Sequence, residues 1–156
     1  MDTLRKEMDN IGITKQETLL SQQVTGTRYF FLNLAHANRG PLRPALGGRE
    51  HCNPDYAVDR EGYVYPGLEY VAEGEGWIKL GNTKHDLTPG TVFSYGTNMR
   101  CVIRTNPAKP LVKYFVCFAG AGAPGRLKKT GVAPGRVRTL ATHAEMRGLF
   151  EELIHE

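Results

Sequence analysis

The chain has 156 residues, of which 40% are hydrophobic, and a formal net charge of +4 at pH 7. This length allows one hydrophobic core and leaves little room for a second domain. No apolar run approaches the roughly 20 residues that a membrane span needs, and the polar N-terminus lacks the apolar stretch of a signal peptide. We therefore expect one soluble, cytoplasmic domain.

The cysteines and the charges limit the kinds of site that this protein could contain. Cys52, Cys101 and Cys117 are odd in number and widely spaced, which predicts small buried thiols and neither a disulfide framework nor structural zinc. Residues 87–144 hold nine Lys or Arg and no Asp or Glu, so this half could attract an anion or could form a solvated face balanced by acids elsewhere. No helix-turn-helix, zinc-finger or RNP-like pattern is present, so we do not expect this chain alone to bind nucleic acid.

Residues 1–23 are polar and are predicted to form an N-terminal arm. Residues 24–36, VTGTRYFFLNLAH, are β-branched and aromatic and predict a first strand, whereas residues 38–55 are rich in Gly, Pro and Asn and predict a long, partner-facing loop. Further strand-like runs follow at 56–60, 62–74, 76–81, 84–88, 91–96, 99–105 and 111–120. Many short strands separated by Gly and Pro turns indicate a mostly β sandwich or barrel over residues 24–120.

Two turns stand out among these strands. In LEYVAEGEGWIKLG, residues 68–81, Gly74 and Gly76 predict a tight hairpin because glycine adopts the positive φ angles that such turns need. In LTPG, residues 87–90, a Pro-Gly turn opens the next strand. Both turns fit a barrel wound from short strands.

The last part, residues 121–156, changes character. Residues 119–138 are rich in small and turn-forming residues and predict a surface excursion. Thr142 and Glu145 have the spacing of a capping box, and an apolar stripe at helical spacing predicts an amphipathic helix over about 142–154. The stripe consists of Met146, Leu149, Phe150, Leu153 and Ile154. We expect it to pack against the barrel or a second chain, and the absence of a helix stop signal suggests a larger protein.

Glu69 and Gly76 have the Glu-x6-Gly spacing of the first cupin motif, and LTPG resembles the start of the second. These motifs are followed by LVKYFVCFAG, TGVAPGR and the amphipathic helix. This order, from about Arg28 to Glu156, resembles the N-terminal regulatory half of AraC-type transcription regulators. The resemblance implies a cupin-like jelly-roll (double-stranded β-helix) barrel that binds a small effector, a helical region that forms a homodimer, and DNA binding only through a C-terminal domain not in this chain.

The chain departs from the metal-binding cupins at their histidine positions. Those proteins have His-x-His shortly before the glutamate and another His after the Pro-Gly turn, whereas this chain has Tyr63, Tyr65 and Cys101 there. Two phenols, a thiol and Glu69 make a poor ligand set for a divalent ion. We therefore expect no metal cofactor and no catalysis.

Side chains alternate along a strand, so Tyr63 and Tyr65 are expected to share the inward direction of Glu69. The resemblance further places Arg60, Lys113 and Phe115 beside a ligand. The predicted ligand-binding residues are Arg60, Tyr63, Tyr65, Glu69, Cys101, Ile103, Lys113 and Phe115. The alternative is that the tyrosines are core and that the charged side chains form salt bridges at the barrel mouth.

Together these residues would suit a small polar or anionic effector, such as a sugar, because they combine charged hydrogen-bonding groups with a flat aromatic face. Two other functions stay open. One is a free-standing, metal-dependent cupin enzyme, either a sugar isomerase or a dioxygenase. The other is a storage-like or structural barrel without a pocket.

Overall fold

The structure is a computed structural model, and it describes residues 21, 23–31 and 40–155. Most of the expected N-terminal arm, and the end of the expected first strand at 32–36, lie outside the described residues. None of the described helices is both long and apolar enough to cross a membrane.

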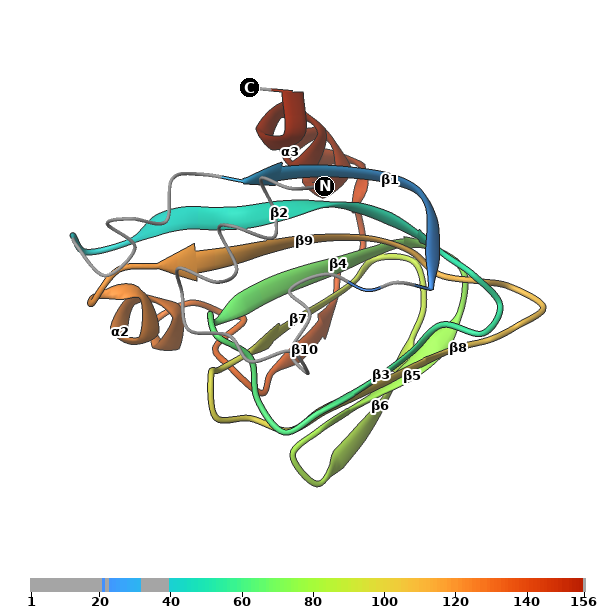
Figure 1. The fold of residues 1–156 in the computed structure, drawn as a ribbon, viewed down its shortest axis with the longest axis horizontal. Coiled ribbons are helices and arrows are strands. Elements are labelled where there is room, and N and C mark those ends of the chain that lie inside the picture. Colours follow the sequence, from blue (N-terminus) through green and yellow to red (C-terminus); the bar gives the residue numbers. More distant parts are fainter. Residues whose placement is uncertain (1–20, 22, 32–39, 156) are drawn as a thin grey trace, which may run out of the picture.

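Two antiparallel sheets face each other (Figure 1). The larger sheet has the order β1-β2-β9-β4-β7-β10, and the smaller has the order β3-β8-β5-β6. The larger sheet comprises β1 (Val24–Phe31), β2 (Arg43–Cys52), β4 (Gly67–Glu73), β7 (Thr91–Tyr95), β9 (Val112–Ala119) and β10 (Val137–Thr139). The smaller sheet comprises β3 (Ala57–Arg60), β5 (Gly76–Leu80), β6 (Thr83–Leu87) and β8 (Cys101–Thr105). From β2 to β9 the chain crosses to the other sheet after every strand except β5, which forms a hairpin with β6, and this winding produces the expected jelly-roll barrel.

The barrel interior is closed by apolar and aromatic side chains from both sheets. One group of buried side chains includes Val71, Ile78, Phe93 and Ile103. A second group surrounds Phe115 and includes Leu46, Tyr65 and Cys117. Because these side chains alternate with outward-facing neighbours along each strand, the interior follows from the period of two in the strand sequences.

A helix covers the outer face of the larger sheet. Helix α3 (Ala144–His155) lies over β1, β2 and β9, whereas the short helix α2 (Ala123–Lys128) lies at one end of the barrel (Figure 1). Phe150 of α3 stacks with Tyr70 at 6.1 Å between ring centroids and tilts against Tyr114 at 5.6 Å. The helix begins one residue later than the capping box predicts, since the carbonyl of His143 accepts the first helical hydrogen bond, from Arg147 N–H.

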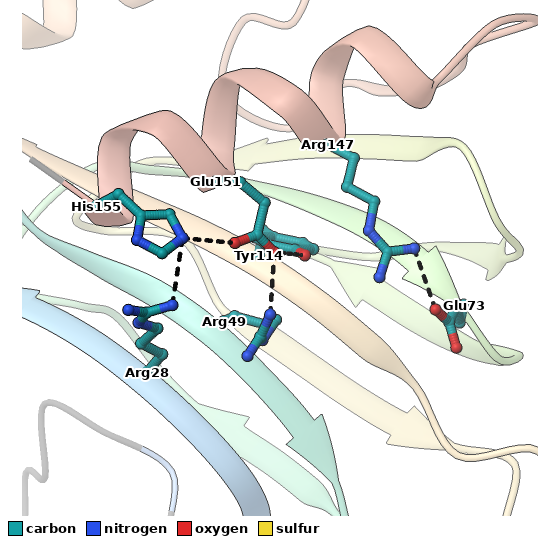
Figure 2. Close-up of polar contacts among 7 residues, drawn as sticks. All are labelled: Arg28, Arg49, Glu73, Tyr114, Arg147, Glu151 and His155. Atoms are coloured by element: carbon teal, nitrogen blue, oxygen red, sulfur yellow. Dashed lines mark hydrogen bonds and ion pairs between the residues drawn. The ribbon is translucent and has the colours of Figure 1, made fainter.

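Polar contacts surround this aromatic contact (Figure 2). Glu151 accepts hydrogen bonds from the Tyr114 hydroxyl and from Arg49 Nη1, the latter at 3.0 Å. Arg147 Nη1 donates to Glu73 at 3.1 Å, at the other end of the helix. The C-terminal helix is therefore attached to the same body as the barrel.

The predicted apolar stripe divides into a packed part and an exposed residue. Met146, Phe150, Leu153 and Ile154 belong to the cluster between α3 and the sheet, whereas Leu149 is 62% exposed. Four of the five residues thus pack on the barrel of their own chain. Leu149 is the one that stays available for a second chain.

We predict that Leu153→Glu and Leu149→Glu have very different effects. Leu153→Glu places a charge between α3 and the sheet and should destabilise the protein by about 2 to 4 kcal/mol. Leu149→Glu should change the free energy of unfolding by no more than about 0.5 kcal/mol, because its side chain is in solvent. Urea unfolding measures both, and sedimentation velocity tests for loss of a dimer. Equal destabilisation by the two variants would contradict this packing of α3.

Two sequence predictions about connections are wrong. The segment 38–55 is not a long loop, because it contains β2, which pairs with both β1 and β9 inside the larger sheet. The Gly74–Gly76 turn is not a hairpin, because β4 and β5 belong to different sheets. Gly74 does have the expected positive φ, at +83°, but the turn carries the chain from one sheet to the other. The hairpin lies one turn later, between β5 and β6.

Candidate ligand pocket

A small cavity lies inside the barrel between the two sheets. Its walls are Ser21, Glu50, Tyr56, Val58, Arg60, Tyr63, Glu69, Tyr95, Ile103, Lys113 and Phe115. Six of the eight predicted ligand-binding residues are among them, and the other two are Tyr65 and Cys101. Tyr65 packs in the core near Phe115, and Cys101 lies behind the wall, directly opposite Arg60 in the β3–β8 pair.

Lys113 lies at the centre of a buried charge cluster. Its Nζ is 2.7 Å from Glu50 Oε2 and 2.8 Å from Glu69 Oε2. Glu50 is the cross-strand partner of Lys113 on β2, and Glu69 comes from β4 on the other side of β9. All three side chains are at most 4% exposed. Lys113 is therefore not at the barrel mouth, where we expected it, but deep in the interior.

These contacts fix the charge of Lys113. Burial alone lowers the pKa of a lysine, but the carboxylates of Glu50 and Glu69 together raise the pKa of Lys113 well above its ordinary value. Its amine is thus held as an ammonium ion with two anionic partners. A protonated amine cannot act as a nucleophile, so this lysine is suited to binding and to structure.

Arg60 reaches the same cavity from β3 in the opposite sheet. Val58 and Arg60 are the inward residues of this strand, and Ala57 and Asp59 point to solvent. The Arg60 guanidinium carbon lies 4.3 Å from the centroid of the Tyr63 ring and 4.8 Å from that of Tyr95. Such cation–π contacts hold the plane of the guanidinium in a fixed orientation.

The edge of this guanidinium lacks hydrogen-bond partners. Arg60 Nε and Nη2 are both buried and have no hydrogen-bond partner of good geometry among the described residues; the guanidinium lies beside the Cys101 thiol, which is only a weak acceptor. Buried charged donors without acceptors are costly and uncommon in folded proteins. Glu50 Oε2 is the other lining atom without a hydrogen bond, but it lies 2.7 Å from the Lys113 ammonium, so Arg60 is the lining group that most needs a partner.

One lining residue, Ser21, lies close to the start of β1. Ser21 Oγ lies 3.4 Å from the hydroxyl of Tyr56, and the Gln23 side chain accepts a hydrogen bond from Ala57 N–H at 2.9 Å. The cavity volume is about 20 Å³. That volume holds one or two water molecules, or a group of two polar atoms such as a carboxylate.

The three thiols are buried, as the sequence predicts. Burial raises the pKa of Cys101 to about 11, although the neighbouring Arg60 guanidinium acts in the opposite direction. Burial also raises the pKa values of Cys52 and Cys117 to about 12. Neutral thiols are weak nucleophiles and weak metal ligands, so the cysteines serve as small core residues.

The residues at this site do not fit a divalent metal ion. The two carboxylates that face the cavity already contact the Lys113 ammonium, and a second cation, Arg60, lines the same space. No imidazole is among the lining residues. Across the described residues, no group of three or more His, Cys, Asp or Glu side chains is arranged to hold a metal ion. A metal ion would have to compete with the Lys113 ammonium and the Arg60 guanidinium for the carboxylates of Glu50 and Glu69.

Sequence reasoning missed several lining residues. Glu50 was assigned to a loop, and its place opposite Lys113 depends on β2 being a central strand. Tyr56 and Tyr95 were not singled out, although Tyr95 forms one wall of the Arg60 contact. Strand alternation within residues 91–95 could have identified Tyr95 as an inward residue, because Tyr95 lies two positions after Phe93 and points in the same direction.

Comparison with known proteins supports the fold and leaves the family open. No protein-family model matches the chain, and no curated protein does so either. Among solved structures, the YhaK protein from Escherichia coli matches with a TM-score of 0.54 at 13% identity, covering 74% of this chain and 51% of that one. The KdgF protein from Halomonas sp. matches with a TM-score of 0.44 at 14% identity, covering 67% and 91%. The plu4264 protein from Photorhabdus luminescens matches with a TM-score of 0.48 at 11% identity, covering 67% and 82%.

The likeness to YhaK and the sheet topology show a cupin-like, double-stranded β-helix barrel. At such low identity a shared fold says nothing of a shared reaction or ligand, because one fold carries many functions. The function therefore has to be argued from the cavity itself.

Proposed function

We propose that this chain is a small-molecule-binding domain and not an enzyme. The observation that carries the proposal is the cluster of Glu50, Lys113 and Glu69 on the cavity wall. Burying three charges in a barrel that is otherwise filled with apolar side chains costs stability, and an apolar replacement of similar volume is often as stable or more so. Such a costly arrangement at a cavity is typical of a binding site.

We further propose that the bound molecule is an effector and that the chain is the regulatory part of an AraC-type transcription regulator. Support for this comes from the order of the sequence motifs, from the barrel followed by an amphipathic helix, and from the exposed Leu149 on that helix. In this proposal the chain forms a homodimer, and DNA is bound by a domain that follows it. Ligand binding would then change how the helix is presented to the second chain.

The rival function is a metal-dependent cupin enzyme. Its activated water or oxygen would need a metal ion, and the ligand set described above gives such an ion a poor place to bind. A metal-free binding domain also explains why Lys113 is neutralised by two carboxylates.

We predict that purified protein is stabilised by small polar or anionic molecules and indifferent to metals. A thermal-shift screen over sugars, sugar acids and small carboxylic acids should give at least one ligand that raises the melting temperature, because a ligand that binds only the folded state stabilises it. Elemental analysis should find no stoichiometric iron, manganese or zinc, and treatment with a chelator should leave the melting temperature unchanged. A fall of several degrees that added iron or zinc reverses would support the enzyme instead.

A flat result across the whole ligand panel would favour the structural barrel without a ligand. The reading frame of the gene is an independent check on the regulator. A helix-turn-helix domain after Glu156 would support it, and an unrelated continuation would contradict it.

A further inference from the structure

Two cations line the cavity, and of these Lys113 alone is in direct contact with carboxylates of the described residues. Lys113 forms ion pairs with both Glu50 and Glu69. Arg60 forms no ion pair within the described part of the chain, and its Nε and Nη2 atoms have no hydrogen-bond partner there. The positive charge available to a ligand is therefore that of Arg60.

We propose that the pocket recognises a ligand with a single carboxylate, which binds the Nε and Nη2 edge of Arg60. This inference rests on the proposed function, since it names the class of molecule that the cavity takes. Tyr63 and Tyr95 contact the guanidinium from adjacent directions, with their rings perpendicular and their centroids 6.1 Å apart, and the Nε and Nη2 edge has no hydrogen-bond partner among the described residues. Nε–H and one Nη2–H point in parallel, and a carboxylate accepts both of them at once.

The neighbouring thiol does not fill this role. Cys101 is opposite Arg60 in the strand pair, but burial keeps its thiol neutral at physiological pH. A neutral thiol is a weak hydrogen-bond acceptor and brings no negative charge. The guanidinium charge thus stays available beside the cavity.

The size and the charge of the site limit the ligand. A volume of about 20 Å³ accepts the two oxygens of a carboxylate in place of water, and the rest of the ligand would extend along the lining residues away from Arg60. Glu50, Lys113 and Glu69 together carry one negative charge, and Arg60 offsets it. A monocarboxylate in direct contact with Arg60 is attracted more strongly than it is repelled by carboxylates that contact Lys113. A second negative charge would have no cation left to meet it.

The carboxylates of Glu50 and Glu69 add a second requirement. Both line the cavity and can accept hydrogen bonds from a ligand, and neither can donate one while ionised. A hydroxyl group next to the ligand's carboxylate would supply that donor. A 2-hydroxy acid such as glycolate is therefore the smallest probe that carries both features.

The test compares matched probes on the whole chain by isothermal titration and ligand-observed NMR, at constant ionic strength. Glycolate should bind at least tenfold more tightly than the neutral glycolamide or ethylene glycol, and more tightly than the dianion oxalate. Arg60→Gln should weaken glycolate binding by roughly tenfold to a hundredfold and remove the preference over glycolamide, because a charged hydrogen bond to the ligand is lost. The affinity of Arg60→Lys for glycolate should lie between those of the unmodified chain and of Arg60→Gln, since lysine keeps the charge but lacks the two parallel N–H donors.

Arg100→Gln is the matched control, because Arg100 is an exposed arginine whose ion pairs with Asp59 and Glu61 lie on the surface. It should bind glycolate as the unmodified chain does. Equal binding of glycolate and ethylene glycol, or tighter binding of a dianion, would overturn the inference and leave the proposed function standing. No binding by any of these probes would also overturn it, and the proposed function falls only if the broad ligand panel is silent too. If Arg60→Gln does not fold, the inference is still tested by Arg60→Lys and by the relative affinities of the unmodified chain for glycolate and glycolamide.

Discussion

Replacing Lys113 with methionine is expected to destabilise the protein by about 3 to 5 kcal/mol, because it leaves the buried carboxylates of Glu50 and Glu69 facing each other without a cation. Urea unfolding followed by circular dichroism measures the loss. Lys109→Met is the matched control: Lys109 forms an ion pair of the same length, 2.7 Å, with Glu75, but on the surface. That variant should lose less than about 1 kcal/mol, since exposed ion pairs contribute little.

A triple variant separates the lost attraction from the new repulsion. Adding Glu50→Gln and Glu69→Gln to Lys113→Met removes all three charges and should recover a large part of the stability. If the single variant is as stable as the unmodified chain, Lys113 does not neutralise the two carboxylates. If the triple variant is no better than the single one, the cost comes from lost packing of the lysine stem.

The pH dependence of this effect has a definite sign. The pKa of Lys113 is raised in the folded state, so its ion pairs stabilise the fold in full below the unfolded pKa of about 10.4 and are lost as the pH rises through the higher folded value. The difference in unfolding free energy between the unmodified chain and Lys113→Met should therefore be constant between pH 7 and 10. It should shrink only above about pH 10.4.

Gly74→Ala is expected to cost roughly 2 to 5 kcal/mol. Gly74 has a φ of +83°, and a Cβ there would lie 2.2 Å from the carbonyl oxygen of Pro110 and 2.8 Å from Leu111 Cα. These backbone atoms lead directly into β9, so they cannot move without shifting that strand. The cost combines backbone strain with overpacking.

Gly81→Ala is the control for strain alone, because Gly81 also has a positive φ, at +58°, but no atom within 4 Å of the added Cβ. It should lose only about 1 to 2 kcal/mol. Urea unfolding of both variants gives the comparison. Similar losses at the two positions would mean that the contact with Pro110 and Leu111 is unimportant at the crossing between the sheets.

The strands that the sequence predicts well are short, alternate in polarity and end at a turn residue. The segment 76–81 becomes β5 and the segment 91–96 becomes β7, each within one residue of the expected bounds. Pattern reasoning works here because local strand propensity and the flanking turn residues agree with the fold; β7 is buried along its whole length.

Strand β2 was missed because its glycines suggest a loop. The structure gives their physical reason: a Cβ on Gly47 would lie 2.6 Å from the Phe115 carbonyl oxygen, and one on Gly48 would lie 2.2 Å from that of Arg28. Only glycine fits where neighbouring strands approach so closely. Since neighbours in space are not visible in a single sequence, the strand and its Glu50 could not be placed.

The pocket was predictable in part for a related reason. The resemblance placed Arg60 and Lys113 beside a ligand, and strand alternation turned Glu69 inward; all three line the cavity. The sequence does not show which of the two cations forms ion pairs. That depends on the distances from Lys113 to Glu50 and Glu69, which lie on neighbouring strands of the folded chain. The exposure of Leu149 could not be predicted either, because the sheet beneath α3 determines how wide a face of the helix is covered.

The alternation of charges on β2 and β9 also specifies how these strands pair. Glu50 faces Lys113 inside the barrel, and the next pair, Arg49 and Tyr114, faces outward to Glu151 of α3. A slip of β9 by one residue would turn Lys113 to the outer face that Arg49 already occupies, and it would leave Glu50 in the interior without its cation. The same four residues thus reject misaligned pairings during folding, a form of selection against wrong structures that an apolar core alone would not supply.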